Sequence, residues 1–268
     1  MGTKLRTGLT ILLAIFLMYQ QLWLQPTETQ VFSSHLPEAF DGFRIVQLSD
    51  LHGRQFGQDN WLLLRCVRKM QPDMIAVTGD LLDEDAELSQ SLRLLTALHA
   101  IAPTFFVTGN HEWSLTHPRD ILEAIATTGV TVLENESVTL TKNGQQILLG
   151  GVHDPCGPWD MITPAQMGQA LRQEVGEEAF FLLLGHRNET AAYWSETTAD
   201  LVLAGHAHGG LVRLPYLGGV IRRHGSIGFD SGLYSNDRTQ LFVSRGLGGQ
   251  GLRLFNRPEV ALLVLRKS

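Results

Sequence analysis

The chain has 268 residues, of which 44% are hydrophobic and 18% charged, and its formal net charge is −6. This composition is typical of a globular protein with a large apolar core. The negative balance leaves no basic excess to neutralise phosphates, which argues against nucleic acid as a stable partner. The two cysteines, Cys66 and Cys156, form neither a metal-type spacing nor a disulfide framework.

The N-terminus has the pattern of a membrane segment. Lys4 and Arg6 precede an apolar stretch that runs to Leu24, and no small-x-small cleavage pattern follows it. We predict an uncleaved single-span anchor over residues 1–30; the alternative is an amphipathic or buried helix, because the run is near the short limit for crossing a bilayer. The positive flank predicts a cytoplasmic N-terminus, with the rest of the chain on the non-cytoplasmic side of the cell membrane.

The segment after the apolar stretch is polar and contains Pro26, which predicts a tether over residues 25–34. We expect the tether to extend over 31–42 and one globular domain to occupy 43–268. Within that domain, helices are expected over 61–70, 86–101 and 116–128 and from 163 onward. Strands are expected over 43–49, 74–78, 104–108, 130–133, 146–152, 179–184, 200–204, 240–244 and 259–265.

The order of these elements predicts the fold class. Strand, helix, strand in the first half favours parallel pairing and a layered α/β fold. The strand-rich second half predicts a second, mixed sheet packed on the first.

Five short motifs carry the residue types that hold metal ions, and four of them directly follow an apolar run that is expected to be a strand. They are Asp50-Leu51-His52, Gly79-Asp80, Gly109-Asn110-His111-Glu112, Gly185-His186 and Gly205-His206-Ala207-His208. A spacing of two in a strand would put Asp50 and His52 on one face. A glycine directly before Asp80, Asn110, His186 and His206 would let the backbone turn sharply so that these side chains reach the ions.

The donor atoms indicate which ions the site holds. The candidate ligands mix carboxylate and amide oxygens with imidazole nitrogens and include no thiolate; they are Asp50, His52, Asp80, Asn110, His186, His206 and His208. Such a set suits two divalent ions of manganese, iron, zinc or cobalt, with manganese favoured, better than calcium or magnesium. The carboxylate of Asp80 can bridge the two ions.

The charge balance predicts the chemistry. Two divalent ions bring about +4 and the two aspartates offset about −2, so the centre attracts an anion and lowers the pKa of a bound water. This favours hydrolysis of a phosphoester by metal-bound hydroxide. His111 is then free to donate a proton to the leaving oxygen, and Glu112 is a candidate to orient it.

Each motif alone has a structural explanation. Asp50 alone is compatible with a turn, and Gly79-Asp80 with an ordinary strand-to-loop junction. His153 and Asp154 also follow an expected strand, but a structural role is favoured for them. Four further histidines are interpreted as structural: His35, His99, His117 and His224.

Together, the motifs resemble the signature of the calcineurin-like metallophosphoesterases: Asp-x-His, Gly-Asp, Gly-Asn-His-Asp/Glu, Gly-His and Gly-His-x-His. The resemblance runs from about Phe43 to the C-terminus and implies a four-layer α/β/β/α sandwich of two mixed sheets. It implies one ion held by Asp50, His52, Asp80 and His208, and a second by Asp80, Asn110, His186 and His206, with His111 as the acid.

Finer features favour a branch of this family. Residues 244–248 and 257–260 resemble the membrane-associated or exported bacterial phosphodiesterases. The soluble UDP-diacylglucosamine pyrophosphatases usually have Arg where this chain has His111, and Gln is common in this branch where Leu211 stands here.

The expected substrate is a phosphodiester or a pyrophosphate, and the anchor alone favours a lipid-linked one. Three alternatives remain: a membrane-bound UDP-2,3-diacylglucosamine-type pyrophosphatase, a phosphomonoesterase that would use an arginine such as Arg54, and a non-catalytic scaffold. A scaffold would have lost ligands, and this chain retains them all.

Overall fold

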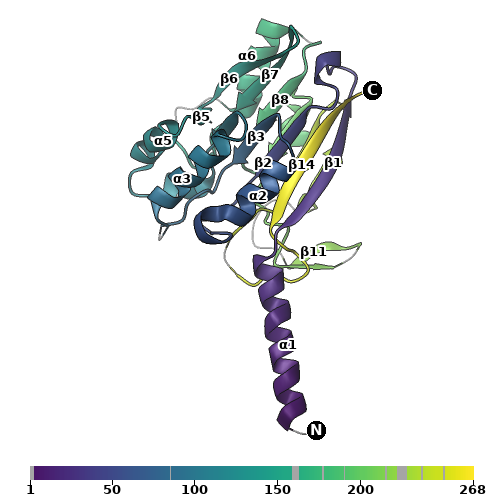
Figure 1. The fold of residues 1–268 in the computed structure, drawn as a ribbon. Coiled ribbons are helices and arrows are strands. Elements are labelled where there is room, and N and C mark those ends of the chain that lie inside the picture. The colour runs from purple at the N-terminus through teal and green to yellow at the C-terminus, as the bar shows by residue number, and fades with distance from the viewer. Residues whose placement is uncertain are drawn as a thin grey trace.

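A computed structural model describes residues 3–84, 86–158, 163–176, 178–189, 191–214, 216–221, 228–236, 238–249 and 251–268. His224 lies outside these ranges. The body consists of two six-stranded sheets packed face to face, with helices on the outer faces. A single helix, α1 (Thr3–Leu22), projects from one end of this body (Figure 1).

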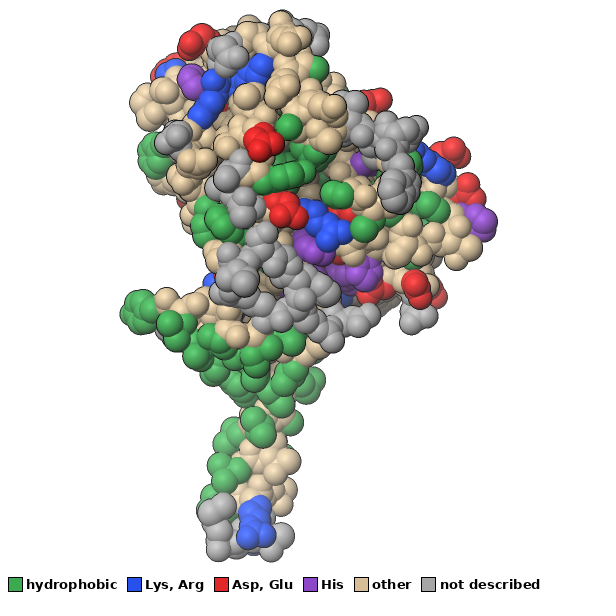
Figure 2. Space-filling view, turned by 180° about the vertical axis from the view of Figure 1, so that it is seen from behind, with side chains coloured by type: hydrophobic (Ala, Val, Ile, Leu, Met, Phe, Trp, Pro, Cys, Tyr) green, Lys and Arg blue, Asp and Glu red, His purple; other side chains and the backbone are tan. Residues whose placement is uncertain are grey.

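Helix α1 is the one helix of the described residues that is long and apolar enough to cross a membrane, over Lys4–Leu22. All of its leucines and isoleucines except the partly buried Leu17 are exposed rather than packed on the body. Figure 2 shows hydrophobic side chains along α1 and across the part of the body from which it projects. A signal sequence would have the same length and composition.

The first sheet has the strand order β1-β14-β2-β3-β4-β5. Its strands are β1 (Gln25–Ser33), β2 (Arg44–Leu48), β3 (Met74–Thr78), β4 (Thr104–Val107), β5 (Thr131–Val132) and β14 (Glu259–Lys267). Strands β2 to β5 pair in parallel, as the strand–helix–strand order predicts. The last strand, β14, pairs antiparallel with β2, so the C-terminal strand belongs to this sheet and not to the second one.

The prediction of an irregular tether over residues 25–34 is wrong. This segment forms β1, which pairs in parallel with β14 along its whole length and crosses the expected boundary between residues 30 and 31. Its burial alternates along the strand, with only Val31 fully buried. It is an edge strand, where polar residues and a proline are tolerated because one side of the backbone needs no partner. The expected order of anchor, tether and catalytic domain otherwise stays a prediction.

The second sheet has the order β12-β13-β9-β8-β7-β6. Its strands are β6 (Glu136–Lys142), β7 (Gln145–Gly151), β8 (Phe181–Leu184), β9 (Leu201–Ala204), β12 (Gly232–Ser235) and β13 (Gln240–Val243). Strands β7, β8, β9 and β13 are parallel, whereas the edge strands β6 and β12 are antiparallel to their neighbours. A separate two-stranded hairpin joins β10 (Val212–Leu214) and β11 (Gly218–Ile221).

The helices divide between the two outer faces. Helices α2 (Trp61–Lys69), α3 (Leu88–His99) and α5 (Pro118–Ala126) pack with the first sheet, and α6 (Pro164–Val175) and α7 (Ala191–Ser195) pack with the second. The remaining elements are the short helix α4 (Asn110–Ser114) and the 3₁₀ turns η1 (Glu38–Phe40) and η2 (Gln58–Asn60).

Three apolar clusters connect the layers, because successive side chains of a strand point to opposite faces. In β3, Ile75 and Val77 pack with the helices, whereas Met74 and Ala76 pack between the two sheets. In β8, Leu182 and Leu184 face the first sheet and Phe181 and Leu183 face the outer helices. This arrangement confirms the predicted four-layer α/β/β/α sandwich of two mixed sheets.

Candidate metal centre

The predicted ligands all follow strands of the two sheets. Asp50, Asp80 and Asn110 come after β2, β3 and β4 of the first sheet. His186 comes after β8 of the second sheet, and His206 and His208 come after β9. The parallel strands therefore bring residues that are up to 158 positions apart to one end of the sandwich, where ligands bind in layered α/β folds.

The backbone at these positions is unusual. Five of the seven predicted ligands have a positive φ, between 51° and 65°: Asp50, His52, Asp80, His206 and His208. Such a φ costs free energy for a residue with a side chain and clusters at functional sites. The prediction that Asp50 and His52 share one face of a strand is therefore wrong. Both residues lie in the loop after β2, and each has a left-handed backbone conformation. Their side chains nevertheless reach the same place.

The glycines before the ligands serve close packing more than turning. Only Gly79 of the four has a positive φ. At Gly205 an added Cβ would lie 1.9 Å from Ser49 Oγ and 2.5 Å from Asp50 Oδ2. The absence of a side chain at Gly205 lets the end of β9 approach the loop that carries Asp50. The predicted role of glycine in a sharp backbone turn therefore holds for Gly79 and not for Gly205.

The first group of candidate ligands contains Asp50, His52, Asp80 and His208, whose ligand atoms all lie within 4.8 Å of one another. The distance from His52 Nε2 to Asp80 Oδ2 is 3.7 Å, and that from His208 Nε2 to Asp50 Oδ1 is 3.5 Å. Both aspartates are fully buried.

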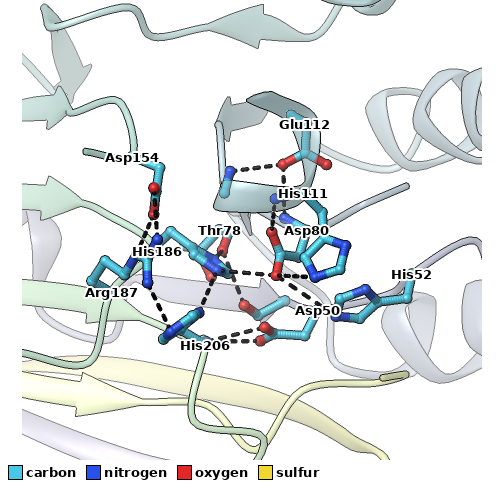
Figure 3. A network of polar contacts seen from close by, with 12 residues as sticks. Asp50, His52, Thr78, Asp80, His111, Glu112, Asp154, His186, Arg187 and His206 are labelled. Atoms are coloured by element: carbon cyan, nitrogen blue, oxygen red, sulfur yellow. Dashed lines mark hydrogen bonds and ion pairs between the residues drawn. The ribbon is translucent and has the colours of Figure 1, made fainter. Parts of the chain in front are cut away.

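The second group contains Asp80, His186 and His206. His186 Nε2 lies 3.2 Å from Asp80 Oδ2, and His186 Nδ1 donates to the carbonyl of Thr78 at 2.9 Å. In its neutral form with the proton on Nδ1, the ring would present the Nε2 lone pair to an ion at the centre. His206 Nδ1 lies 3.2 Å from His186 Nε2. Asp80 belongs to both groups, and Figure 3 shows the rings of His52, His111 and His186 directed at it.

Asp83 is a site residue that the sequence analysis missed. Its Oδ1 accepts at 2.7 Å from both His52 Nδ1 and His111 Nδ1. Burial opposes ionisation, but these bonds hold the pKa of Asp83 well below its usual range. The hydrogen bond to Asp83 in turn raises the pKa of His111, which favours its protonated form. One carboxylate thus fixes both rings, with each Nε2 directed at Asp80.

Glu112 does not orient His111 as predicted. It is fully buried, and its carboxylate accepts from the backbone N–H groups of Gly109 at 2.7 Å, Asp80 at 2.9 Å, Leu81 at 2.7 Å and Leu82 at 3.3 Å. Glu112 therefore ties the loop that carries Asp80 to the start of α4, which carries Asn110 and His111. Burial raises the pKa of this carboxyl.

Two of the three histidines of the second sheet, His206 and His208, are in the form that suits metal binding. Burial opposes the charged form of the third, His186, but the charge of Asp80 raises its pKa to about 10. Burial lowers the pKa of His208 to about 4, and burial together with the charge of His186 lowers that of His206 to about 3. Both rings are therefore neutral near pH 7, which is the form that binds an ion.

The site opens into a cleft of about 270 Å³, lined by His52, Asp80, Asn110, His111, His206, Ala207, His208, Gly210, Leu211, Gly248, Gly249 and Arg253. Arg253, a second residue missed by the sequence analysis, is buried and donates to the carbonyls of Gly246 and Arg245. Burial lowers its pKa to about 10, so it keeps its charge at neutral pH. Arg54 does not line this cleft; it donates to the carbonyl of Gln21 and packs on Phe56.

The partly exposed Arg187 and the buried Asp154 form an ion pair beside the second group. Arg187 Nε lies 2.6 Å from Asp154 Oδ2, and its Nη2 lies 3.0 Å from Oδ1. Arg187 Nη1 also lies 3.0 Å from His206 Nε2. The sequence analysis favoured a purely structural role for Asp154. The structure connects it to the metal centre as well, because its partner Arg187 contacts the candidate ligand His206.

The residues fit a pair of divalent ions on two observations. First, the donors are oxygen and imidazole nitrogen atoms, grouped around a shared carboxylate. Second, His52 Nε2 and Asn110 Oδ1 are buried without a hydrogen-bond partner among the described residues. Buried polar atoms are rarely left without one, so these two atoms fit coordination to an ion.

Comparison with known proteins agrees with this geometry. The family model for the calcineurin-like phosphoesterases matches residues 43–210, and the chain belongs to this family. It is 28% identical to the metallophosphoesterase YkuE of Bacillus subtilis, covering 91% of this chain and 86% of YkuE. It is 29% identical to the phosphodiesterase YaeI of Escherichia coli, covering 83% and 82% of the two chains.

Two further comparisons concern function and fold. The UDP-2,3-diacylglucosamine pyrophosphatase LpxG of Chlamydia muridarum is 26% identical, covering 85% of this chain and 86% of LpxG. The crystal structure of TT1561 from Thermus thermophilus superposes with a TM-score of 0.51 at 15% identity, covering 76% of this chain and 89% of that one. The second likeness shows the fold alone. The chain is therefore a metal-dependent phosphoesterase with a candidate dinuclear site.

Proposed function

We propose that this protein is a membrane-anchored, dinuclear-metal phosphodiesterase of the exported bacterial branch. The observation that carries the proposal is the position of Asp80, which belongs to both groups of candidate ligands and whose Oδ2 faces the Nε2 atoms of His52 and His186. A carboxylate between two sets of donors is the arrangement that a bridged pair of ions needs.

The ligand sets follow from the two groups. Asp50, His52, Asp80 and His208 would hold one ion; Asp80, Asn110, His186 and His206 would hold the other. Asn110 is assigned by the buried, unpartnered Oδ1 and by its place in the lining of the cleft. The oxygen and nitrogen donors favour manganese over iron, zinc and cobalt only weakly, and metal analysis decides between them.

The chain's own residues account for the rest of the reaction. Bound divalent ions would supply the positive charge that attracts a phosphate and acidifies water. His111 lies on the cleft with its Nδ1 held by Asp83, and its protonated form can donate a proton to the leaving oxygen. Arg253 adds a fixed positive charge to the wall of the cleft.

Contacts at the end of α1 support an uncleaved anchor over a removed signal sequence. Gln20 is buried, Gln21 Nε2 donates to the carbonyl of Arg253 at 2.8 Å, and Arg54 donates to the carbonyl of Gln21. Strand β1 then begins at Gln25, three residues after the helix ends. Cleavage would remove contacts next to the cleft. With Lys4 and Arg6 retained in the cytoplasm, the site lies on the non-cytoplasmic side of the membrane.

The principal alternative is hydrolysis of a pyrophosphate, as in a membrane-bound UDP-2,3-diacylglucosamine-type pyrophosphatase. The similarity to LpxG over most of both chains favours it as the second candidate. A phosphomonoesterase would need an arginine to hold a dianion. Arg54, the residue suggested for that role, lies outside the lining of the cleft, and the guanidinium of Arg253, which does line it, donates to the carbonyls of Gly246 and Arg245. A non-catalytic scaffold is disfavoured because the seven predicted ligands converge.

The test is a comparison of substrates on the full chain in detergent. The protein is stripped of metal, reloaded with manganese, iron, zinc or cobalt, and assayed on bis(4-nitrophenyl) phosphate, 4-nitrophenyl phosphate and a nucleoside diphosphate sugar. We expect metal-dependent turnover of the diester or the pyrophosphate to exceed that of the monoester. A preference for the monoester, or no turnover with any of these metals, would contradict the proposal.

A further inference from the structure

Most exposed large apolar side chains of the described residues lie on two neighbouring features. The first is α1 with Trp23. The second, which we call the apolar rim, lies on the β10–β11 hairpin and on the loop over 251–257. The rim consists of Leu214, Tyr216, Leu217, Val220, Ile221, Leu252 and Phe255. So many exposed apolar side chains on one part of the surface mark a site that contacts a partner or a membrane when the protein functions.

The rim is joined to α1. The rings of Phe255 and Phe16 lie with their centroids 5.8 Å apart, and the guanidinium of Arg257 lies 5.0 Å from the ring centroid of Tyr19. The hairpin is joined to the same loop, because Arg213 N donates to the Leu254 carbonyl at 3.0 Å and Leu254 N donates to that of Leu211 at 2.9 Å. Figure 2 shows the apolar surface of the body continuing onto α1.

The length of α1 fixes how deep the rim lies. Its apolar span of 19 residues is about 28 Å long, which is barely the thickness of a hydrocarbon core of about 30 Å. With Lys4 and Arg6 at the cytoplasmic headgroups, the residues from Thr7 to Leu22 are all needed to cross the hydrocarbon core. Phe16 lies six residues before the end of the helix at Leu22, which is about 9 Å along its axis. A side chain beside Phe16, such as that of Phe255, must then enter the bilayer.

The rim also borders the cleft. Leu211 lines the cleft and immediately precedes β10, and Arg253 lines it between the rim residues Leu252 and Phe255. The hairpin that carries the rim thus begins at the wall of the candidate active site.

Resting on the proposed function, we propose that the apolar rim inserts into the leaflet at the C-terminal end of α1. It thereby seats the mouth of the cleft at the level of the lipid headgroups. The substrate class is then an amphiphile of that leaflet whose phosphodiester or pyrophosphate lies at the headgroup level. The occupant of the rim is the bilayer that α1 spans, because the rim continues the apolar surface of that helix.

Depth-dependent fluorescence quenching tests the insertion without reference to activity. A probe is attached at Leu217→Cys or Phe255→Cys in the full chain, with Cys66 and Cys156 replaced by serine, and reconstituted in nanodiscs that contain acyl-chain-brominated lipids. Phe32→Cys is the matched control, because Phe32 is 54% exposed and Phe255 57%. Phe32 lies seven residues along β1 from Gln25, about 23 Å from the end near α1.

We expect several-fold stronger quenching of the two rim probes than of the control probe. Rim probes that are quenched no more than the control would overturn the proposal. Cross-linking of the rim to a second copy of the chain, without such quenching, would also overturn it and assign the rim to self-association.

Turnover tests the substrate class. The double variant Leu217→Gln/Phe255→Asn is compared with Phe32→Gln on a soluble diester and on a phosphodiester lipid in vesicles. We expect the rim variant to lose about tenfold or more on the vesicle substrate and little on the soluble one. Equal losses on both would contradict delivery from the bilayer. Quenched rim probes in a protein that hydrolyses neither substrate would leave the insertion standing and refute the proposed function instead.

Discussion

Replacing Asp83 should show whether one carboxylate positions both a metal ligand and the proton donor. Asp83 Oδ1 accepts from His52 Nδ1 and His111 Nδ1, each at 2.7 Å. In Asp83→Asn the amide oxygen can still accept both bonds, but without charge. Charge-assisted bonds are roughly twice as strong as neutral ones, so about 1 kcal/mol is lost per bond and about 2 kcal/mol in all. In rate terms this is about 30-fold.

The leaving group separates the two effects. A diester of 4-nitrophenol needs little protonation of its leaving oxygen, so it should report mainly the loss at His52. A diester of unsubstituted phenol needs the proton of His111 and should report both losses. We therefore expect kcat/KM of Asp83→Asn to fall about 30-fold on diphenyl phosphate and several-fold less on bis(4-nitrophenyl) phosphate.

Two variants serve as controls. His111→Asn should reproduce the leaving-group dependence without affecting metal content, whereas Asp83→Ala should lose more than Asp83→Asn on both substrates. Equal losses of Asp83→Asn on the two diesters would refute a role of Asp83 through His111. Wild-type activity of both Asp83 variants would refute any positioning role.

Three further changes test the frame of the site. Glu112→Gln places an amide donor against two of the four backbone N–H groups, and we expect a loss of about 3 kcal/mol in stability, seen as a lower melting temperature in detergent. Asp154→Asn leaves the Arg187 guanidinium without its charge partner; about 3 kcal/mol of stability and part of the metal affinity should be lost, measured by thermal melting and metal titration. Gly205→Ala puts a Cβ against Asp50 and should cost about 1 to 3 kcal/mol with a fall in activity, whereas unchanged melting and turnover would show that the β9 loop relaxes freely.

Much of the fold could be predicted because its central strands are buried on both faces and therefore appear in the sequence as continuous apolar runs. Strands β2, β3, β4, β8 and β9 all meet this description, and each was expected within two residues of its observed bounds. Edge strands do not have this pattern. Most residues of β1 are polar, and its second residue is Pro26, so the segment lacks the pattern of a buried strand. Its pairing with β14 depends on tertiary structure that the local sequence does not encode.

The site shows the same division. The seven predicted ligands are recognisable because they stand in a known pattern at or just after strand ends, and four of them directly follow a glycine. Asp83 and Arg253 lack such a marker, and only the folded chain shows that Asp83 lies between His52 and His111. The acidic run from Asp83 to Asp85 beside a histidine-rich site was the one available signal for Asp83. Glu112 was noticed, but its four backbone partners come from two loops whose approach the sequence does not specify.

The central claim is that Asp80 is shared by two bound ions, and metal content with activity measures it directly. Full-length protein and the Asp80→Ala variant are loaded with manganese, freed of excess metal and analysed for ions per chain and for diester turnover. The structure predicts two ions and metal-dependent turnover in the wild type, and at most one ion with no turnover in Asp80→Ala. Two ions retained by the variant, or full wild-type turnover with no bound metal, would contradict the account.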